Sequence, residues 1–337
     1  MTTPFEAAVA AHRAGDFAAA ERAYLQLSTS VNANHNLAVL YTDFGHPERA
    51  EAIFRHLVEQ RPADLRARQH LALLRLAQRR YDEAWLEHEA VRLAVNPEHV
   101  APVADNPAWT GGPLAGRRLT VVAEQGAGDQ IMWGRYLAAL GERGAAVTVA
   151  SGPALTRLFE AVGVATCPLP PAGAALPAAD LWVMMGSLPA ILGGPPPGPE
   201  WLAGLAGTGG GGVGVMPRGN PAYVHDASRS PPDAMVARLL RLGRDLRPEA
   251  SGAKDFRDTA AIVAGLDLVI SVDTSVAHLA ASMGKPVWVL LPRLSLDWRW
   301  NDGVRSDWYP QARLLRQDRG RDWAGLIDRV ERDLAET

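Results

Sequence analysis

The chain has 337 residues, 47% of them hydrophobic and 21% charged, and its formal net charge is −3. This length and composition describe a globular protein of two or three domains, and a chain without a basic excess is not expected to bind nucleic acid. The one cysteine, Cys167, excludes an intramolecular disulfide and a cysteine metal cluster, and it fits a reducing compartment.

No segment is predicted to enter or cross a membrane. The N-terminal stretch places Glu6 before any basic residue and has no long apolar core, so it does not resemble a signal peptide. The longest apolar runs, Leu266–Val272 and Val287–Leu291, have the length of strands and are too short to span a bilayer. We therefore expect a cytoplasmic protein.

Small residues recur in the first part of the chain in pairs that lie twelve positions apart. The pairs are Ala8 and Ala20, Ala38 and Ala50, and Ala72 and Ala84. The offsets between them are near the roughly 34-residue period of the tetratricopeptide repeat (TPR), which this segment resembles. A generic helical bundle with alanines at its contacts is the alternative. We predict an all-α TPR domain over residues 1–98, whose concave face would bind a protein or peptide partner, and a linker over 99–116.

Residues 117–206 alternate between strand and helix patterns. The expected elements are the strand Leu119–Ala123, a glycine turn at 124–129, the helix Ile131–Leu140, the strand Val147–Ala150, the helix Pro153–Val162 and the strand Leu181–Met185. Strands that alternate with helices form parallel sheets. We predict a compact Rossmann-like lobe here.

Residues 207–337 form a second predicted lobe. Its expected elements are a hinge at Gly209–Gly212, the strands Val213–Met216 and Leu266–Val272, the turn Asp273–Ser275, the helix Val276–Met283, the strand Val287–Leu291 and a final helix with its apolar face from Trp323 to Leu334. No strand pattern is apparent between Ala234 and Lys254, so one strand–helix unit is expected to be missing.

The segment 271–280 carries the strongest motif of the chain. A helix that begins just beyond the carboxyl end of a buried strand offers free N–H groups and a positive dipole end, which bind diphosphates. Thr274 and Ser275 add hydroxyl donors, and His278 lies in the first turns of the helix. The alternative interpretation is that residues 273–275 only cap the helix and that His278 is a packed core histidine.

This segment resembles the donor-binding turn of the lipopolysaccharide heptosyltransferases, which are family 9 glycosyltransferases. Three further stretches are similar to the same group: 124–129 with 135–137, 187–189, and 297–300 with 308–310 and 313–317. The order of the domains resembles TPR-containing glycosyltransferases and, more distantly, protein O-GlcNAc transferases. The resemblance implies the α/β fold class, with a GT-B-like pair of Rossmann-type lobes preceded by an all-α repeat domain. Lobe 117–206 would bind the acceptor, and lobe 207–337 the nucleotide sugar.

The resemblance also implies roles for individual residues. Asp129 takes the position of the catalytic base, although it is also a candidate N-cap of the helix at Ile131. Arg229 would contact a phosphate, unless it is an ordinary surface arginine. The implied donor positions are Arg218, Asn220, Arg229, Asp273, Thr274, Ser275, Val276 and His278, and the implied acceptor or cleft positions are Gln125, Gly126, Gly128, Gln130 and Arg135.

The aromatic residues near the C-terminus allow two interpretations. They are Trp298, Trp300, Trp308 and Tyr309. Aromatic faces of this kind form stacking platforms for a sugar or a base, but such clusters more often hold a terminal segment against the core, and we favour the second interpretation.

The predicted function is that of an inverting glycosyltransferase, of the hexosyl or heptosyl type. It would move a sugar from a nucleotide-diphosphate donor to a protein or glycan acceptor, with no cofactor and no metal. The alternative is a non-catalytic TPR adaptor with a degenerate transferase region. A nucleotide-dependent epimerase or dehydrogenase is disfavoured, because Ile131 stands where the third glycine of Gly-x-Gly-x-x-Gly belongs.

Overall fold

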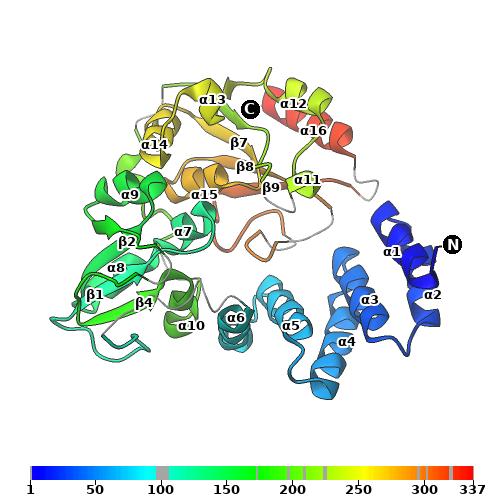
Figure 1. Cartoon of the computed structure of the whole chain (residues 1–337). Coiled ribbons are helices and arrows are strands. Elements are labelled where there is room, and N and C mark those ends of the chain that lie inside the picture. The colour runs from blue at the N-terminus through cyan, green and yellow to red at the C-terminus, as the bar shows by residue number, and fades with distance from the viewer. Residues whose placement is uncertain are drawn as a thin grey trace. The chain divides into compact units, whose positions relative to one another are not determined.

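The computed structural model describes residues 2–95, 106–171, 174–195, 198–207, 210–222, 226–293, 297–300, 303–318 and 322–336 (Figure 1). The chain forms two compact units, one of residues 1–95 with 293–302 and the other of residues 96–292 with 303–337. Residues 99–105 of the predicted linker and Gly209 of the predicted hinge lie outside the described residues.

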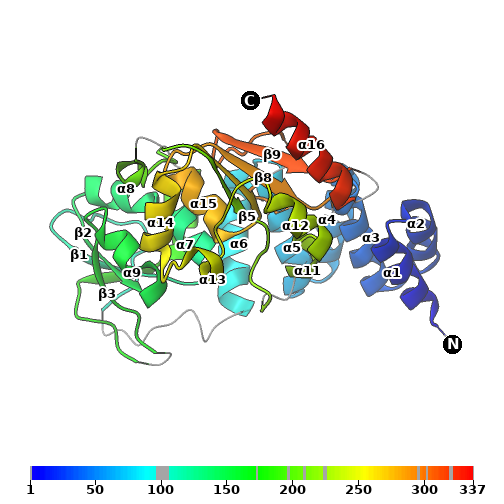
Figure 2. The same cartoon turned by 90° about the horizontal axis from the view of Figure 1, so that it is seen from above.

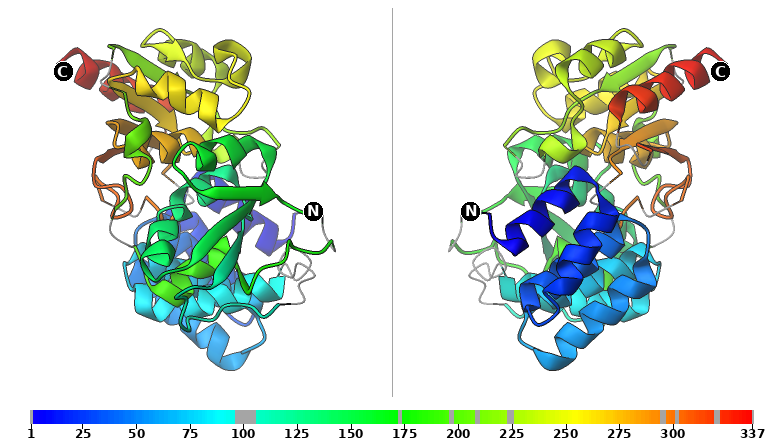
Figure 3. Two further views of the ribbon diagram at one scale, coloured as in Figure 1. Left: turned by 90° about the vertical axis from the view of Figure 1, so that its left-hand side faces the viewer. Right: turned by 90° about the vertical axis from the view of Figure 1, so that its right-hand side faces the viewer.

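The first unit contains three consecutive helical hairpins (Figure 1, Figure 3). Their helices are α1 (Pro4–Ala14), α2 (Phe17–Gln26), α3 (Val31–Asp43), α4 (Pro47–Gln60), α5 (Leu65–Ala77) and α6 (Tyr81–Val95). All six alanines of the repeating pairs are completely buried. The absence of longer side chains there lets the helices of a hairpin approach closely, as the spacing predicts.

The turn inside each hairpin has the same backbone conformation. Gly15 and Gly45 end the first helix of their hairpins in the left-handed region, with φ of 80° and 79°. The equivalent residue of the third hairpin is Arg79, with φ of 66°. Glycine adopts this conformation without steric cost, whereas arginine does not, so the third hairpin closes with local strain.

A segment from the far end of the sequence completes the first unit. Trp298 packs edge-on against Trp85 of α6, with ring centroids 5.3 Å apart, and Tyr81 stacks on the same indole at 6.2 Å. Trp298 and Trp300 are buried. These two tryptophans therefore hold residues 297–300 in place, as the structural interpretation expected.

The second unit contains two parallel sheets. The first has the strand order β3-β2-β1-β4. Its strands are β1 (Arg118–Val122), β2 (Ala146–Ser151), β3 (Ala165–Pro168) and β4 (Leu181–Met184). The helix α9 (Pro153–Glu160) connects β2 to β3. Strand β3 was not predicted, because its residues include a proline and only the central two are even partly buried.

The predicted helix Ile131–Leu140 is wrong in detail. The chain forms two short helices instead, α7 (Ala127–Trp133) and α8 (Tyr136–Glu142), which meet at Gly134. The ring of Trp201 lies against this junction, and a Cβ at position 134 would come within 2.2 Å of it. A large side chain from a distant segment therefore packs where the helix is interrupted, which the local sequence pattern does not reveal.

The second sheet has five parallel strands in the order β6-β5-β7-β8-β9. They are β5 (Val213–Met216), β6 (Arg244–Asp245), β7 (Leu268–Val272), β8 (Val287–Leu291) and β9 (Ala312–Arg316). On one face, alternate strand residues such as Ile270 and Leu290 form a core with Leu326, Ile327 and Val330 of the last helix. That helix, α16 (Trp323–Ala335), lies beside α12 (Asp233–Leu239) (Figure 2).

The expectation that the stretch 234–254 lacks a strand is also wrong. Strand β6 has only two residues and pairs with β5 through Gly214 and Arg244. Gly243 precedes it, and a Cβ there would lie 2.2 Å from the carbonyl oxygen of Val213. Two residues are too few to show a period, so only pairing with β5 defines this strand.

The remaining helices of this unit connect the strands or precede them. They are α10 (Leu188–Leu192), α11 (Asp226–Arg229), α13 (Pro248–Ser251), α14 (Phe256–Ala264) and α15 (Ser275–Ser282), with the 3₁₀ turns η2 (Met185–Ser187) and η3 (Ala203–Leu205). The fold class is as predicted: an α/β arrangement with two Rossmann-type lobes that follows an all-α region of helical hairpins.

Candidate active site

Each sheet of the second unit has one point at which successive connections leave in opposite directions. In the first sheet it lies between β1 and β4, and in the second between β5 and β7. Ligands of open α/β sheets bind in the crevice outside the carboxyl ends of the strands at such points. The predicted site residues follow β1, β5 and β7, so the sheet topology brings them to these two positions.

The turn after β1 is held by its own polar groups. Glu124 accepts a hydrogen bond through Oε1 from the N–H of Gly186, which follows β4, at 3.0 Å. Gln130 donates to the carbonyl oxygen of Gln125 at 3.2 Å. Gln125 has φ of 61°, a left-handed conformation that non-glycine residues rarely adopt and that is concentrated at functional sites.

Asp129 is not the N-cap of its helix. Helix α7 begins four residues earlier than predicted, with Gly126 as its N-cap. Asp129 is the third residue of the helix, and its Oδ2 accepts a hydrogen bond from the N–H of Gly126 at 3.2 Å. The carboxylate therefore satisfies a free N–H of the first turn and lies near the positive end of the helix.

The turn after β7 leads into helix α15, whose N-cap is Thr274. Its Oγ1 accepts from the N–H of Val276 at 3.3 Å and lies 3.0 Å from the hydroxyl of Ser271. Thr274 and Val276 are buried, whereas Asp273 and Ser275 are half-buried. Of the hydroxyls predicted to bind the donor, that of Thr274 is thus engaged in the cap, and Ser275 is the more accessible one.

The residues after β5 bind one another. Arg229 donates through Nε to Asp226 at 3.1 Å, and Asp226 also accepts from the Ser230 hydroxyl at 3.0 Å. Ser230 accepts in turn from the N–H of Gly219 at 3.1 Å. Nearby, Arg218 pairs with the exposed Asp233, and Asn220 accepts from the N–H of Ala222 at 3.0 Å. Arg218 and Asn220 thus lie in the loop after β5 and Arg229 at the end of α11, and both arginines already have carboxylate partners.

The first turns of α7 and α15 touch each other. A Cβ at Gly128 would lie 2.9 Å from Cδ2 of His278 and 3.4 Å from the Cα of Ser275. Only glycine allows this approach without displacing one helix. The structure thus brings the turn that carries Asp129 and the turn that carries Ser275 and His278 to one place in the second unit.

His278 is buried, and one edge of its ring contacts Tyr309. Its exposed fraction is 4%, and its Nδ1 lies 3.1 Å from the hydroxyl of Tyr309. The guanidinium carbon of Arg135 lies 4.8 Å from the centre of the Tyr309 ring and 5.2 Å from that of Trp308. Arg135, predicted to line the cleft, is buried, with an exposed fraction of 3%.

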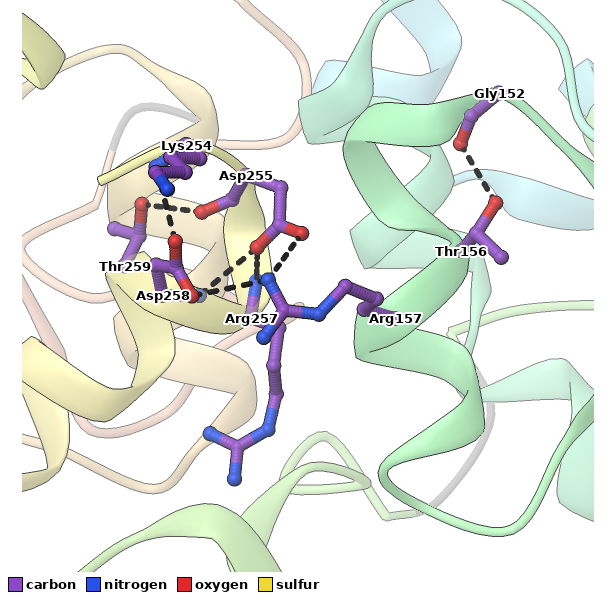
Figure 4. A network of polar contacts seen from close by, with 8 residues as sticks. All are labelled: Gly152, Thr156, Arg157, Lys254, Asp255, Arg257, Asp258 and Thr259. Carbon is purple, nitrogen blue, oxygen red and sulfur yellow. Dashed lines mark hydrogen bonds and ion pairs between the residues drawn. The ribbon is translucent and has the colours of Figure 1, made fainter.

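An ion-pair cluster joins the two lobes of the second unit (Figure 4). Arg157 of α9 reaches Asp255 at 2.8 Å and Asp258 at 3.1 Å, both at the start of α14. Asp255 also caps α14 by accepting from the N–H groups of Arg257 and Asp258. The pKa of Asp258 is lowered, first by the hydrogen bond from the N–H of Lys254 and then by Arg157.

Sequence reasoning missed two residues that hold distant segments of the second unit together. Trp201 donates from Nε1 to the carbonyl oxygen of Ile131 at 2.9 Å. Lys285 is buried and donates to the carbonyl oxygens of Ala264, Leu266 and Gly207 at 2.8, 3.0 and 3.3 Å. A lone tryptophan and a lysine between glycine and proline carry no period or motif, so nothing in the sequence indicated these roles.

A separate groove of about 680 Å³ opens on the first unit, beside α4, α5 and α6. Its walls include Leu86, which is 71% exposed, and the ion pair of Arg68 with Glu87. Several of its charged groups are already paired, among them Arg68 with Glu87 and Arg75 with Glu51. We regard the contact of α7 with α15, although it is less hollow, as the candidate active site.

The sequence of the second lobe provides a family match. Residues 230–290 match the model of glycosyltransferase family 9 (heptosyltransferase). The matched stretch contains β6, α14, β7 and α15, and hence the turn 273–275 and His278. The family similarity thus falls on the residues that carried the predicted resemblance, and it supports glycosyl transfer in general as the activity of this unit.

Other comparisons add little. No curated protein matches the chain. Among solved structures, a mutant O-GlcNAc transferase of Thermobaculum terrenum aligns over 99% of this chain and 92% of its own, at 15% identity and a TM-score of 0.25. A likeness this weak carries no conclusion.

Two further properties concern the described residues alone. None of their helices combines the length and the apolar character that crossing a bilayer requires. No three of their histidine, cysteine, aspartate or glutamate side chains cluster as metal ligands would.

Proposed function

We propose that the second unit transfers a sugar from a nucleotide-diphosphate donor to a hydroxyl acceptor with inversion, and that Asp129 is the general base. The observation that carries the proposal is the contact of Gly128 with Ser275 and His278. It brings the helix turn that carries Asp129 next to the N-terminus of α15, so a donor bound there and an acceptor hydroxyl beside Asp129 would meet.

The donor diphosphate would lie at the start of α15. The positive end of the helix dipole favours anions there, and the half-buried Ser275 adds a hydroxyl. Arg229 would help neutralise the leaving diphosphate by exchanging Asp226 for a phosphate oxygen, a charge-assisted contact. In this proposal no metal is required, and EDTA should leave turnover unchanged. Loss of turnover with EDTA that manganese restores would contradict it.

The acceptor is proposed to be a protein or glycan presented near the helical hairpins. The groove beside α4, α5 and α6 offers the first unit a surface with both an exposed apolar residue, Leu86, and charged groups. Such mixed surfaces suit a peptide segment. The donor sugar is proposed to be a hexose or a heptose.

The first test is nucleotide binding. UDP, ADP, GDP and dTDP are added in turn, and the melting temperature is measured, because any ligand of the native state raises it. One of the four should give a shift that Ser275→Trp abolishes. Absence of any shift would favour the alternative function, a non-catalytic adaptor, for which the self-paired arginines after β5 already provide one argument.

The second test separates binding from chemistry. Asp129→Asn retains an oxygen that accepts from the N–H of Gly126, but it removes the basicity. Turnover should fall by roughly 10²-fold to 10⁴-fold, while the nucleotide dissociation constant stays unchanged. Asp322→Asn is the matched control, since Asp322 caps α16 in the same unit by accepting from the N–H groups of Ala324 and Gly325. Full turnover of the Asp129 variant would exclude the proposed base.

A further inference from the structure

The two ring nitrogens of His278 face different surroundings. The Nδ1 edge lies against the Tyr309 hydroxyl at 3.1 Å. The opposite edge faces the first turn of α7, where a Cβ at Gly128 would lie 2.9 Å from Cδ2 and 3.6 Å from Nε2. Because a neutral imidazole carries its proton on one nitrogen only, the partner of Nδ1 decides whether Nε2 presents a donor or an acceptor to the crevice.

Tyr309 is rigidly placed for this role. Its side chain is completely buried, its N–H donates to the carbonyl oxygen of Ser306 at 3.2 Å, and its carbonyl oxygen accepts from Ala312 at 2.9 Å. Gln311, two residues further along the chain, donates to the carbonyl oxygen of Ala281, near the end of α15. Backbone hydrogen bonds thus fix Tyr309, and Gln311 ties the same segment to the helix that carries His278.

Arg135 is a buried cation with no anionic partner among the residues that the structure describes. Its Nε donates to the carbonyl oxygen of Met132 at 3.0 Å, and its guanidinium lies over the rings of Tyr309 and Trp308. Within the described part of the chain, no carboxylate pairs with it, and its Nη2 has no hydrogen-bond partner. Buried charges are normally paired, because burying an unpaired charge destabilises the folded protein. The position of this arginine therefore indicates a functional role.

We infer that Arg135 and Tyr309 are positioning residues that hold His278 as the neutral tautomer protonated at Nε2. A cation over the ring face draws electron density from the phenol and makes its O–H a stronger donor. Tyr309 therefore donates to Nδ1, and the proton of His278 resides on Nε2.

The consequence is a fixed N–H donor in the crevice. The Nε2–H group faces the turns of α7 and α15, where an anionic oxygen of the donor would lie. Its direction is set by Tyr309 before any ligand binds, so no reorganisation is needed. This step rests on the proposed function, whereas the tautomer itself is a property of the protein without ligand.

The tautomer is tested by NMR of the full chain with ¹⁵N-labelled histidine, with the His278 signals assigned by comparison with His278→Gln. The wild-type protein should show a protonated Nε2 and an unprotonated Nδ1. Tyr309→Phe keeps the ring under Arg135 but removes the hydroxyl, and it should shift the Nδ1 and Nε2 signals toward a mixture of tautomers. Arg135→Met should shift them in the same direction, and it tests the inference independently if the tyrosine variant does not fold.

The matched control is Tyr136→Phe. Tyr136 is also completely buried, and its hydroxyl donates to the carbonyl oxygen of Gly193 at 2.7 Å, away from His278. This variant should leave the His278 signals unchanged. The inference is overturned if the wild type carries the proton on Nδ1, or if both Tyr309→Phe and Arg135→Met leave the tautomer as it is.

Nucleotide binding gives a second readout. The dissociation constant of whichever of UDP, ADP, GDP or dTDP binds should rise about twofold to tenfold in Tyr309→Phe and stay constant in Tyr136→Phe. An unchanged constant in Tyr309→Phe would refute the contribution of this tyrosine to binding. If none of the four nucleotides binds the wild type, the proposed function fails, and the tautomer measurement still decides the role of Arg135 and Tyr309.

Discussion

Replacement of Gly128 by alanine tests the contact on which the candidate site depends. The added Cβ would lie 2.9 Å from Cδ2 of His278 and 3.4 Å from the Cα of Ser275. Carbon atoms attract one another best at roughly 3.5–4.0 Å, so α7 and α15 must separate by several tenths of an ångström. The His278 ring cannot easily yield, because Tyr309 holds its other edge.

Two energies oppose each other in this variant. Alanine stabilises a helix by about 1 kcal/mol relative to glycine, whereas overpacking of a buried contact costs about 1–3 kcal/mol. We therefore expect Gly128→Ala to lower the free energy of unfolding by up to about 2 kcal/mol. Nucleotide binding should weaken as well, since the displaced helices carry both halves of the proposed site.

Gly141→Ala is the control for the gain in helix propensity. Gly141 lies in α8, and no atom comes within 4 Å of a Cβ built on it. This variant should gain up to about 1 kcal/mol and bind nucleotide as the wild type does. Urea unfolding measures the stabilities, and titration with the binding nucleoside diphosphate measures affinity. Equal stabilisation by both substitutions, with unchanged binding, would refute the close approach of α7 to α15.

Two further predictions concern buried polar groups. Lys285→Met keeps the aliphatic stem but leaves three backbone carbonyl oxygens without their donor. We therefore expect the free energy of unfolding, measured with urea, to fall by about 2–4 kcal/mol. A decrease smaller than the error of the fit would contradict the structural role of Lys285. Burial lowers the pKa of His35 to about 3 in the folded protein. Below about pH 6.5 the unfolded chain therefore binds a proton at His35 more readily than the folded chain does, and the free energy of unfolding must fall as the pH decreases. Between pH 7 and pH 5 this group should account for a loss of about 2 kcal/mol, which His35→Leu should remove from unfolding curves recorded at both pH values; an unchanged difference would show that His35 is protonated in the folded protein.

Local patterns were enough for much of the fold. The alanines twelve positions apart predicted the hairpins of the first unit, and all of them are buried at helix contacts. Apolar runs predicted β1, β2, β4, β5, β7 and β8 to within a residue or two. These features depend on residues near one another in the chain, through side-chain size, alternation and turn chemistry, so the sequence by itself carries them.

The candidate site shows where such reasoning ends. The residue types after β1 and β7 indicated a ligand site, but the pairing of Gly128 with His278 joins residues far apart in the sequence. Four other features likewise have no local signature in the sequence. They are the short strand β6, the break between α7 and α8 where Trp201 packs, the bonds of Lys285 to three carbonyl oxygens, and the contact of Tyr309 with His278. Each depends on contacts between segments that are distant in the sequence, and only tertiary packing decides these, because such contacts stabilise the chain only once it is folded.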